Sequence, residues 1–139
     1  MSQTPSPASS LTILIVDDED NIRKTLAYCL EGEGHQVVGV SNAADAVAEV
    51  RRRSFDLAFV DLRLGQTDGM DLIPVFRSDS PWTKVVVITA YASIETAVEA
   101  MRRGAADYIP KPFSADQIRL LARRFSRIKE LEMEVASLR

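Results

Sequence analysis

The sequence is short of the residue types on which several kinds of protein depend. Cys29 is its only cysteine, so no internal disulfide can form, and the apolar run around it favours a buried thiol. No apolar stretch approaches the roughly 18 residues that a membrane-spanning helix needs. A net charge of −3 leaves no basic excess of the kind that a large nucleic-acid interface requires. Membrane-spanning and nucleic-acid-binding roles for this chain are therefore disfavoured.

Histidine and tryptophan also occur only once each. His35 lies in the polar turn EGEGHQ, which favours a surface position over a role in phosphorelay. Trp82 follows Pro81 in a loop that we expect to lie close to the functional edge of the fold and to pack there. The basic run 51–53 is expected to end a helix, where positive charge complements the helix dipole.

The overall composition is that of an ordinary globular domain. The chain has 139 residues, of which 46% are hydrophobic and 27% charged, so one domain with a real core is expected. Residues 1–10 are polar and lack the basic segment and apolar core of a signal peptide. They are expected to form a disordered lead, and the expected location is cytoplasmic.

Strand and helix patterns alternate along the chain. Short apolar runs rich in Val and Ile predict buried parallel strands at 12–16, 36–40, 55–60, 84–88 and 106–109. The amphipathic segments between them predict helices, one capped by Asn42 and another ended by Gly104. Residues 63–69 are predicted to form a loop before a helix over about 70–77. Five βα units predict an α/β fold, a doubly wound parallel sheet with helices on both faces.

Polar side chains stand at the carboxyl ends of four of these strands. Asp17 and Asp18 follow the first strand, and Asp61 follows the third. Thr89 follows the fourth, and Lys111 comes just after the fifth. The carboxyl ends of parallel strands lie along one edge of a sheet, where ligands bind. We therefore expect three carboxylates, one hydroxyl and one ammonium to share a small site.

The chemistry of this set favours a metal ion and a phosphoryl group. Neighbouring carboxylates repel by an energy on the order of several kcal/mol at an effective dielectric of about 20, so protonation or a divalent cation must relieve them. Oxygen ligands without His or Cys nearby indicate Mg²⁺ or Mn²⁺ rather than zinc. Asp61 stands alone at its strand end and is the natural nucleophile for an aspartyl phosphate. Lys111 would supply positive charge and Thr89 a hydrogen bond to the transferred oxygens.

Each residue also has an ordinary structural explanation. The Asp17-Asp18 pair can cap a helix, and Asp61 can cap a loop. Thr89 fits a strand on its β-propensity, and a lysine such as Lys111 is usually a solvated surface charge. Chance placement of all five at the same sheet edge is much less favoured, so the combination carries the prediction.

The last helical pattern extends beyond the predicted domain. It begins near Ser114, and its apolar residues then recur at spacings of three, four and three, as in a coiled-coil seam. Two heptads are too few to establish a coiled coil, so a solvated helical tail is the alternative. An apolar stripe of this kind needs a partner, either a second copy or a following domain. The stripe consists of Ile128, Leu131, Val135 and Leu138.

Four stretches of the chain resemble the receiver domain of bacterial two-component response regulators. They are ILIVDDE, DLAFVDLRLGQTDGMDL, VVVITAYAS and GAADYIPKPF. The resemblance covers about residues 11–125 and leaves 126–139 as a helical linker toward an output domain. It implies a flavodoxin-like fold with strand order 2-1-3-4-5 and an extended C-terminal helix.

The resemblance assigns the metal and phosphoryl roles residue by residue. Asp61 matches the phospho-acceptor, and Asp18 matches the direct Mg²⁺ ligand. Asp17 would act on the metal largely through water, and the backbone carbonyl of Arg63 would complete the protein ligands. Lys111 matches the lysine that binds the phosphoryl group.

The switch residues are assigned in the same way. Thr89 matches the switch hydroxyl, and Tyr108 matches the switch aromatic whose ring moves inward when that hydroxyl engages the phosphoryl group. The side chains of Arg63 and Tyr91 stand at positions that tune the lifetime of the aspartyl phosphate. The peptide bond before Pro112 is expected to be cis.

The resemblance also implies a mechanism and partners. A histidine kinase would pass its phosphoryl group to Asp61, and the surface of the fourth helix, fifth strand and fifth helix would then change. That change would control dimerisation and a transcriptional output. The chain would catalyse only its own phosphorylation and dephosphorylation and would otherwise be no enzyme.

Finer features indicate a class of regulator. The variant DLRLG, the dipeptide PW before the fourth strand and the extended helix are similar to sigma-54-dependent, NtrC-type regulators such as those of alginate biosynthesis. An AAA+ ATPase domain and a DNA-binding domain would then follow, and a homodimer would form through the C-terminal helix. One departure is Leu64-Gly65, where many receivers have Met-Pro, which predicts a more mobile loop.

Two other functions compete with this one. A haloacid-dehalogenase-type phosphatase also uses an aspartate nucleophile, but it has a second Asp two residues later, where this chain has Arg63. A receiver-like interaction module that works without phosphorylation typically loses an acidic or lysine position, and this chain keeps them all.

Overall fold

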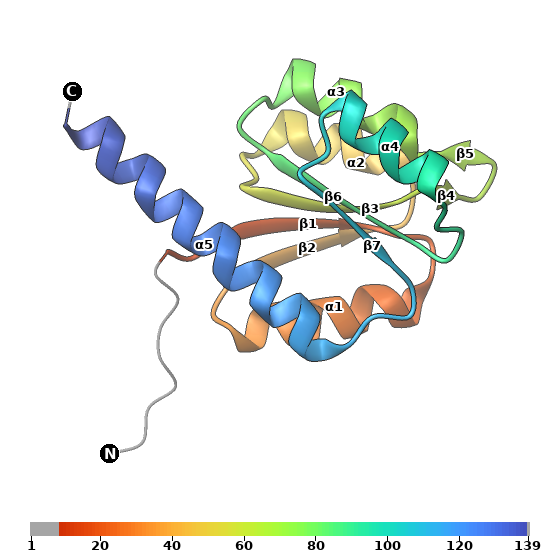
Figure 1. Cartoon of the computed structure of the whole chain (residues 1–139), viewed down its shortest axis with the longest axis horizontal. Helices are drawn as coiled ribbons and strands as arrows, with labels where there is room; N and C mark the ends of the chain where they lie inside the picture. The colour runs from red at the N-terminus through yellow and green to blue at the C-terminus, as the bar shows by residue number, and fades with distance from the viewer. Residues whose placement is uncertain (1–8, 139) are drawn as a thin grey trace.

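A five-stranded parallel sheet lies at the centre of the fold (Figure 1). Its strands are β1 (Thr12–Val16), β2 (Gln36–Val40), β3 (Leu57–Asp61), β6 (Lys84–Thr89) and β7 (Asp107–Pro110). They lie in the order β2-β1-β3-β6-β7, and every neighbouring pair is parallel. Counted along the chain this is 2-1-3-4-5, so the predicted doubly wound sheet is confirmed.

The structure is a computed structural model that describes residues 9–138. Only the last two residues of the predicted disordered lead fall inside this range, so that prediction lies outside the described residues. None of the helices within 9–138 combines the length and the apolar character that crossing a membrane requires.

Helices cover both faces of the sheet (Figure 1). One core cluster lies beneath the middle three helices, and a second lies beneath the first and last. Strand side chains alternate between the clusters, so Leu14 and Val16 join the first and Ile13 and Ile15 the second. The helices are α1 (Asp20–Gly32), α2 (Ala43–Arg52), α3 (Leu72–Asp79), α4 (Ile94–Arg103) and α5 (Ala115–Ser137).

Local signals in the sequence explain where the helices begin and end. The side chain of Asn42 accepts a hydrogen bond from the Asp45 amide at 2.8 Å, which confirms the predicted cap of α2. Gly104 ends α4 at a φ of 112°, as predicted. Helix α4 begins with a reciprocal capping box of Ser93 and Thr96, which was not predicted.

The segment predicted to be a loop at 63–69 contains a short hairpin instead. Strands β4 (Arg63–Leu64) and β5 (Thr67–Asp68) pair in antiparallel fashion, and a short 3-10 helix, η1 (Gly69–Asp71), follows. Gly69 allows the hairpin to return to the end of β3, because a Cβ added there would lie 1.9 Å from the carbonyl oxygen of Asp61. No side chain fits at this position, so Gly69 fixes the path of the chain beside Asp61.

Two predictions about single residues are wrong. His35 is only 4% exposed, and its Nδ1 accepts a hydrogen bond from the Leu11 amide at 3.0 Å. It directly precedes β2 and turns inward there, although the surrounding turn is polar. Trp82 comes before the start of β6, so it lies at the sheet edge opposite the carboxyl ends of the strands. Its predicted position near the functional edge therefore does not hold.

Helix α5 continues past the domain as predicted (Figure 1). Ile128 still packs against the core, whereas Leu131, Val135 and Leu138 are 43%, 53% and 85% exposed. Lys129 ties the helix to the start of the sheet, since its Nζ lies 2.9 Å from the Ser10 carbonyl and 3.1 Å from Asp56 Oδ2. The seam thus leaves the domain as a helix with an exposed apolar stripe.

Candidate functional site

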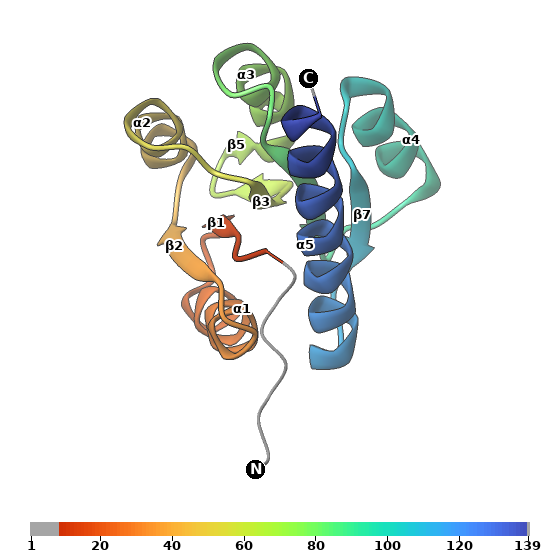
Figure 2. The ribbon, with the colours of Figure 1, turned by 90° about the vertical axis from the view of Figure 1, so that its left-hand side faces the viewer.

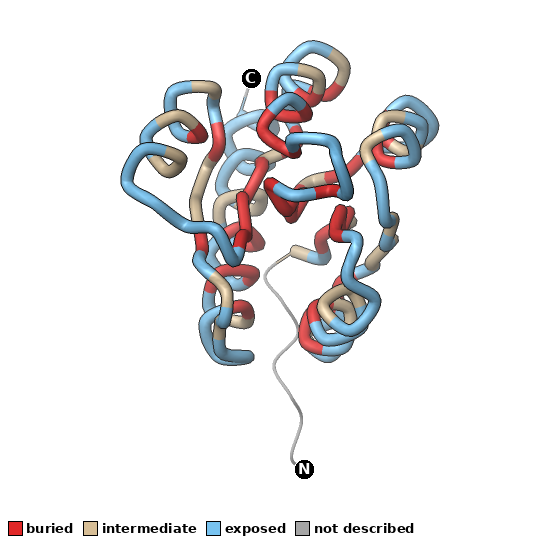
Figure 3. The backbone as a smooth tube through the Cα atoms, turned by 90° about the vertical axis from the view of Figure 1, so that its right-hand side faces the viewer, coloured by how far each residue is buried: buried red, intermediate tan, exposed pale blue. Residues whose placement is uncertain are grey.

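The predicted site residues come together at the carboxyl edge of the sheet. Asp17 directly follows β1, Asp61 ends β3, Thr89 ends β6, and Lys111 directly follows β7. Figure 3 looks onto this edge, where buried strand ends lie at the centre and exposed loops surround them. The parallel register of the strands therefore delivers residues from four separate segments to one place.

Three carboxylates form the centre of the site. Oxygen atoms of Asp17, Asp18 and Asp61 all lie within 4.8 Å of one another. Asp17 and Asp61 are buried, whereas Asp18 is exposed. Backbone amides hold all three, since the Glu19 amide donates to Asp17 Oδ1 at 2.9 Å, the Gly65 amide to Asp18 Oδ2 at 3.1 Å and the Arg63 amide to Asp61 Oδ1 at 3.1 Å. The β4–β5 hairpin thus fixes both the exposed carboxylate and the end of β3.

Lys111 supplies the positive charge of the site. Its Nζ lies 2.9 Å from Asp17 Oδ2 and 2.8 Å from Asp61 Oδ2. Burial acts to lower the pKa of this ammonium, but hydrogen bonds to Asp17 and Asp61 and their negative charges outweigh burial and raise the pKa above its ordinary value. The lysine is therefore charged at any physiological pH. The peptide bond from Lys111 to Pro112 is cis, as the resemblance implied.

The negative charge of the three carboxylates is only partly balanced by positive charge. Burial raises the pKa of the Asp17 carboxyl, and its contacts with Lys111 and the Glu19 amide offset part of that rise. One ammonium faces three carboxylates, so negative charge remains in the cluster. The donor set consists of oxygen atoms, which suits a hard divalent cation such as Mg²⁺ or Mn²⁺. The residues present therefore fit the predicted metal.

The hydroxyls of the two residues predicted to form a switch bond to different partners. Thr89 is fully buried, and its Oγ1 accepts a hydrogen bond from the Tyr91 amide at 3.0 Å. The hydroxyl of Tyr108 lies 2.5 Å from Thr96 Oγ1 and accepts a longer bond of 3.4 Å from the Ser93 amide. Tyr108 is thus attached to the capping box of α4. The S-x-x-T spacing of that box was readable in the sequence.

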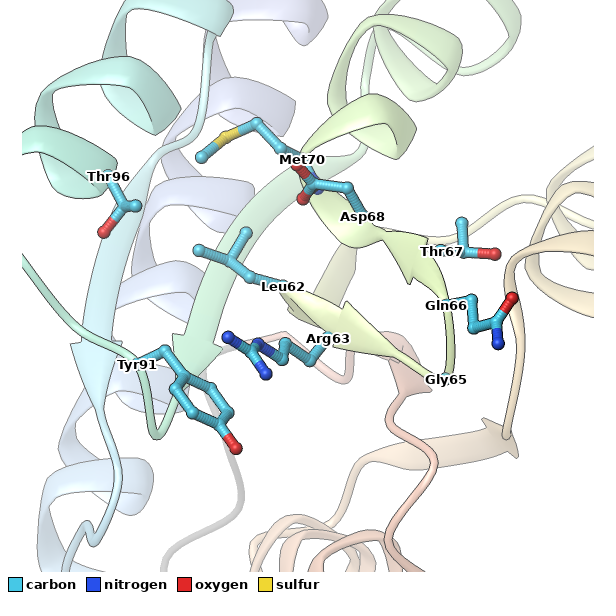
Figure 4. Close-up of a pocket in the computed structure, with 9 residues that line it drawn as sticks. All are labelled: Leu62, Arg63, Gly65, Gln66, Thr67, Asp68, Met70, Tyr91 and Thr96. Carbon is cyan, nitrogen blue, oxygen red and sulfur yellow. The ribbon is translucent and has the colours of Figure 1, made fainter.

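A cleft of about 490 Å³ opens just after the end of β3 in the chain, where Leu62 and Arg63 form part of its wall (Figure 4). The Arg63 guanidinium stacks on the ring of Tyr91, with 3.7 Å from its central carbon to the ring centroid. These are the two side chains for which the resemblance implies an effect on phosphoryl lifetime, and they form part of the cleft wall. The other lining residues are Gly65, Gln66, Thr67, Asp68, Met70 and Thr96.

Not all of the residues singled out in the sequence lie in one cluster. Asp17, Asp18, Asp61 and Lys111 form one cluster, whereas the side chain of Thr89 contacts the backbone next to it. The seam residues of α5 lie outside this cluster, on a helix that leaves the opposite edge of the sheet.

Comparison with known proteins gives a consistent result. The response regulator receiver domain family matches residues 13–123. The alginate biosynthesis transcriptional regulatory protein AlgB of Pseudomonas aeruginosa is 45% identical over 126 residues, which cover 91% of this chain and 28% of that protein. The nitrogen assimilation regulatory protein NtrX of Azorhizobium caulinodans is 39% identical over 129 residues, which cover 91% of this chain and 28% of that protein. The chain thus spans about a quarter of the length of these relatives.

Solved structures are similar as well. The receiver domain of NtrX from Brucella abortus is 41% identical with a TM-score of 0.77, and the match covers 83% of this chain and 98% of that one. A response regulator from Burkholderia pseudomallei with a phosphorylated aspartic acid, a calcium ion and citrate is 34% identical with a TM-score of 0.76, covering 87% of this chain and 72% of that one. The predicted resemblance, including that to the alginate regulator, is confirmed, and the chain belongs to the response regulator receiver domain family.

Proposed function

We propose that this chain is the phospho-accepting switch of a two-component system and that Asp61 receives the phosphoryl group from a histidine kinase. The observation that carries the proposal is the contact of Lys111 Nζ with both Asp17 and Asp61, next to the exposed carboxylate of Asp18. An aspartate nucleophile, a fixed positive charge and a partly uncompensated acidic cluster are the parts that phosphoryl transfer to a carboxylate needs.

In the proposed reaction a carboxylate oxygen of Asp61 attacks phosphorus as the phosphorus–nitrogen bond of phosphohistidine breaks. The leaving imidazole keeps the electron pair of that bond and takes up a proton. Lys111 stabilises the negative phosphoryl oxygens, and the Arg63 amide holds the other side of the acceptor carboxylate. A bound Mg²⁺ or Mn²⁺, held by Asp17, Asp18, Asp61 and the backbone carbonyl of Arg63, would offset further charge. No separate acid or base is required on this chain.

The response to phosphorylation is proposed to run through Thr89 and Tyr108. The Thr89 hydroxyl would turn from the Tyr91 amide toward the phosphoryl group, and Tyr108 would leave the first turn of α4. The surface of α4, β7 and α5 would then change its population of conformations. This surface already exposes apolar side chains, since Ile94 is 84% and Leu120 63% exposed. Arg63 and Tyr91 would set how long the aspartyl phosphate survives.

The output is proposed to lie in parts that follow this chain in a longer protein. The relatives it matches include transcriptional regulators several times its length, which supports a sigma-54-dependent class with an AAA+ ATPase and a DNA-binding domain. We also propose that residues 11–125 form the receiver and 126–139 a linker, and that the cytoplasm is its compartment. A homodimer would form through the seam of Ile128, Leu131, Val135 and Leu138, which the structure leaves exposed apart from Ile128.

Labelling by a small phosphodonor tests the central claim. Incubation with acetyl phosphate and Mg²⁺ should add one phosphoryl group to the wild-type chain, measured by intact mass, and none to Asp61→Asn. Asp116→Asn is a matched control, because its carboxylate is 87% exposed on α5 and pairs with Arg119 rather than with a residue of the acidic cluster. Full labelling of Asp61→Asn would contradict the assignment.

A second measurement separates the competing functions. Amide NMR spectra are recorded with Mg²⁺, with and without beryllofluoride. If the chain is a switch that responds to phosphorylation, beryllofluoride should shift the amide signals of the site and of α4. A chain that responds to neither reagent would be an interaction module that works without phosphorylation. Turnover of many phosphoesters per chain would indicate the phosphatase. Trp82 is unsuited to report metal binding directly, because it lies at the opposite edge of the sheet.

A further inference from the structure

A second cleft lies at the sheet edge opposite the phosphoryl site. It has a volume of about 500 Å³, and its walls come from the end of α2, the end of α3 and the loop before β6. We call it the Trp82 cleft. Trp82 itself is 54% exposed, although large aromatic side chains are usually buried. The cleft is lined by Val50, Arg51, Arg52, Arg53, Ser54, Asp79 and Trp82.

The arginine side chains of the Trp82 cleft have more N–H donors than the neighbouring carboxylates can accept. Arg51 contacts Asp79 at 3.1 Å, while Arg52 and Arg53 share the single carboxylate of Glu49 at 2.5 and 3.4 Å. Three positive charges thus face two negative ones, and each guanidinium has five N–H donors. The arginine side chains are 68%, 65% and 46% exposed. Arginine and tryptophan are enriched among the residues that contribute most to binding at protein interfaces.

A segment of complementary chemistry leaves the domain beside this cleft. Residues 130–134 of α5 read Glu-Leu-Glu-Met-Glu, so three carboxylates alternate with two apolar side chains. Glu132 contacts Lys84 at 3.3 Å, and Trp82 lies only two residues before Lys84 in the chain. Figure 2 looks onto this edge, and Figure 1 shows α5 running past it and away from the domain. The acidic segment and the Trp82 cleft therefore belong to one surface of the molecule.

The helix of the same chain does not fill the cleft. Trp82 and all three arginines stay exposed while α5 passes Lys84 and continues away from the domain (Figure 1). Met133 is 58% exposed and Leu131 43% exposed on that helix. An apolar and acidic segment and an aromatic and basic cleft are thus both left open in a single copy.

We infer that the Trp82 cleft binds the acidic segment 130–134 of a second copy of this chain. The inference rests on the proposed homodimer and names the surface of the receiver that the partner helix contacts. A second helix packed on the exposed stripe of α5 would run past the same edge of the domain. In a two-fold dimer the contact occurs twice, since each copy offers one cleft and one segment. Charge complementarity would also fix the register of the two helices.

The first test is the self-association of charge variants by sedimentation velocity, with and without beryllofluoride. The double variant Arg52→Glu with Arg53→Glu should raise the dissociation constant of the dimer by about tenfold or more. Adding Glu130→Lys and Glu134→Lys to the same chain should recover most of that loss, because the charges are exchanged. Lys24→Glu with Arg119→Glu is the control for net charge, at an exposed position of α1 and a half-buried one of α5, and should dimerise as the wild type does. Circular dichroism checks that each variant is folded.

The second test uses Trp82, the only tryptophan in the chain, as a direct reporter. Its emission maximum should shift to shorter wavelength as the protein concentration rises. The shift should occur over the same range of concentrations as the rise in average mass measured by sedimentation. A wild type that dimerises with unchanged Trp82 emission, or a dimer that is unaffected in Arg52→Glu with Arg53→Glu, overturns the inference and leaves the proposed dimer standing. A wild type that stays monomeric in both states overturns the dimer and the inference together. Labelling of Asp61 is independent of all these outcomes.

Discussion

The hydroxyl of Tyr108 offers the sharpest test of how the proposed switch is held. It lies 2.5 Å from Thr96 Oγ1 and also accepts a bond from the Ser93 amide at 3.4 Å. Tyr108→Phe removes this oxygen and keeps the ring in the core cluster beneath α4. Thr96 and Ser93 keep their bonds to each other after the change, so no polar group is left without a partner.

The expected magnitude follows from this geometry. One intramolecular hydrogen bond contributes about 0.5–1.5 kcal/mol net, and the absence of an orphaned partner puts this case at about 1 kcal/mol. The free energy of unfolding should fall by that amount. If the bond exists only in the resting arrangement, the same energy should shift the equilibrium toward the switched one by a factor of about 5.

Urea denaturation measures the first quantity, and amide NMR of α4 without a phosphodonor measures the second. Tyr28→Phe is the matched control, because Tyr28 is 79% exposed on α1. A double-mutant cycle with Thr96→Val isolates the pair, and a coupling energy of about 0.5–1.5 kcal/mol is expected. Strict additivity in the cycle, or α4 spectra identical to those of wild type, would refute the reasoning.

Three further predictions concern the site and the core. Lys111→Met should lower the free energy of unfolding by about 3–5 kcal/mol in EDTA, because it leaves buried carboxylates unpaired. Mg²⁺ should restore part of that loss. A variant as stable as the wild type in EDTA would contradict the ion pairing. Gly69→Ala should destabilise the fold and slow labelling by acetyl phosphate, since its Cβ would meet the Asp61 carbonyl at 1.9 Å, whereas Gly32→Ala, with nothing within 4 Å, should do neither. Burial lowers the pKa of His35, so this histidine binds a proton more readily in the unfolded chain than in the folded one. The free energy of unfolding should therefore fall as the pH drops below about 6.5. In urea titrations at several pH values, His35→Gln should make this dependence on pH weaker.

Parallel strands explain why so much of the site could be predicted from the sequence. Once the apolar runs are identified as strands of one parallel sheet, Asp17, Asp61 and Lys111 must meet at its carboxyl edge, whatever the loops do. Trp82 precedes its strand, so the direction of the parallel strands places it at the other edge.

Contacts between side chains and distant elements could not be predicted in this way. His35 stands in a polar turn, and only the tertiary contact with the Leu11 amide shows that it points inward. The attachment of Tyr108 to α4 depends likewise on how one helix start sits against β7. Such contacts join elements that are distant in sequence, and no local pattern encodes them.

The energies of the contacts favour a switch carried by side chains rather than by the sheet. The residues of β3 and β6 that lead to the site are almost fully buried, and moving them would disturb both core clusters. The Thr89 and Tyr108 hydroxyls each make contacts worth only about 1 kcal/mol. A new phosphoryl charge on Asp61 can outweigh contacts of that size, because charge-assisted hydrogen bonds are about twice as strong as neutral ones. In the proposed switch, α4 can therefore change its first turn and its exposed apolar side chains while the sheet and the acidic cluster stay in place.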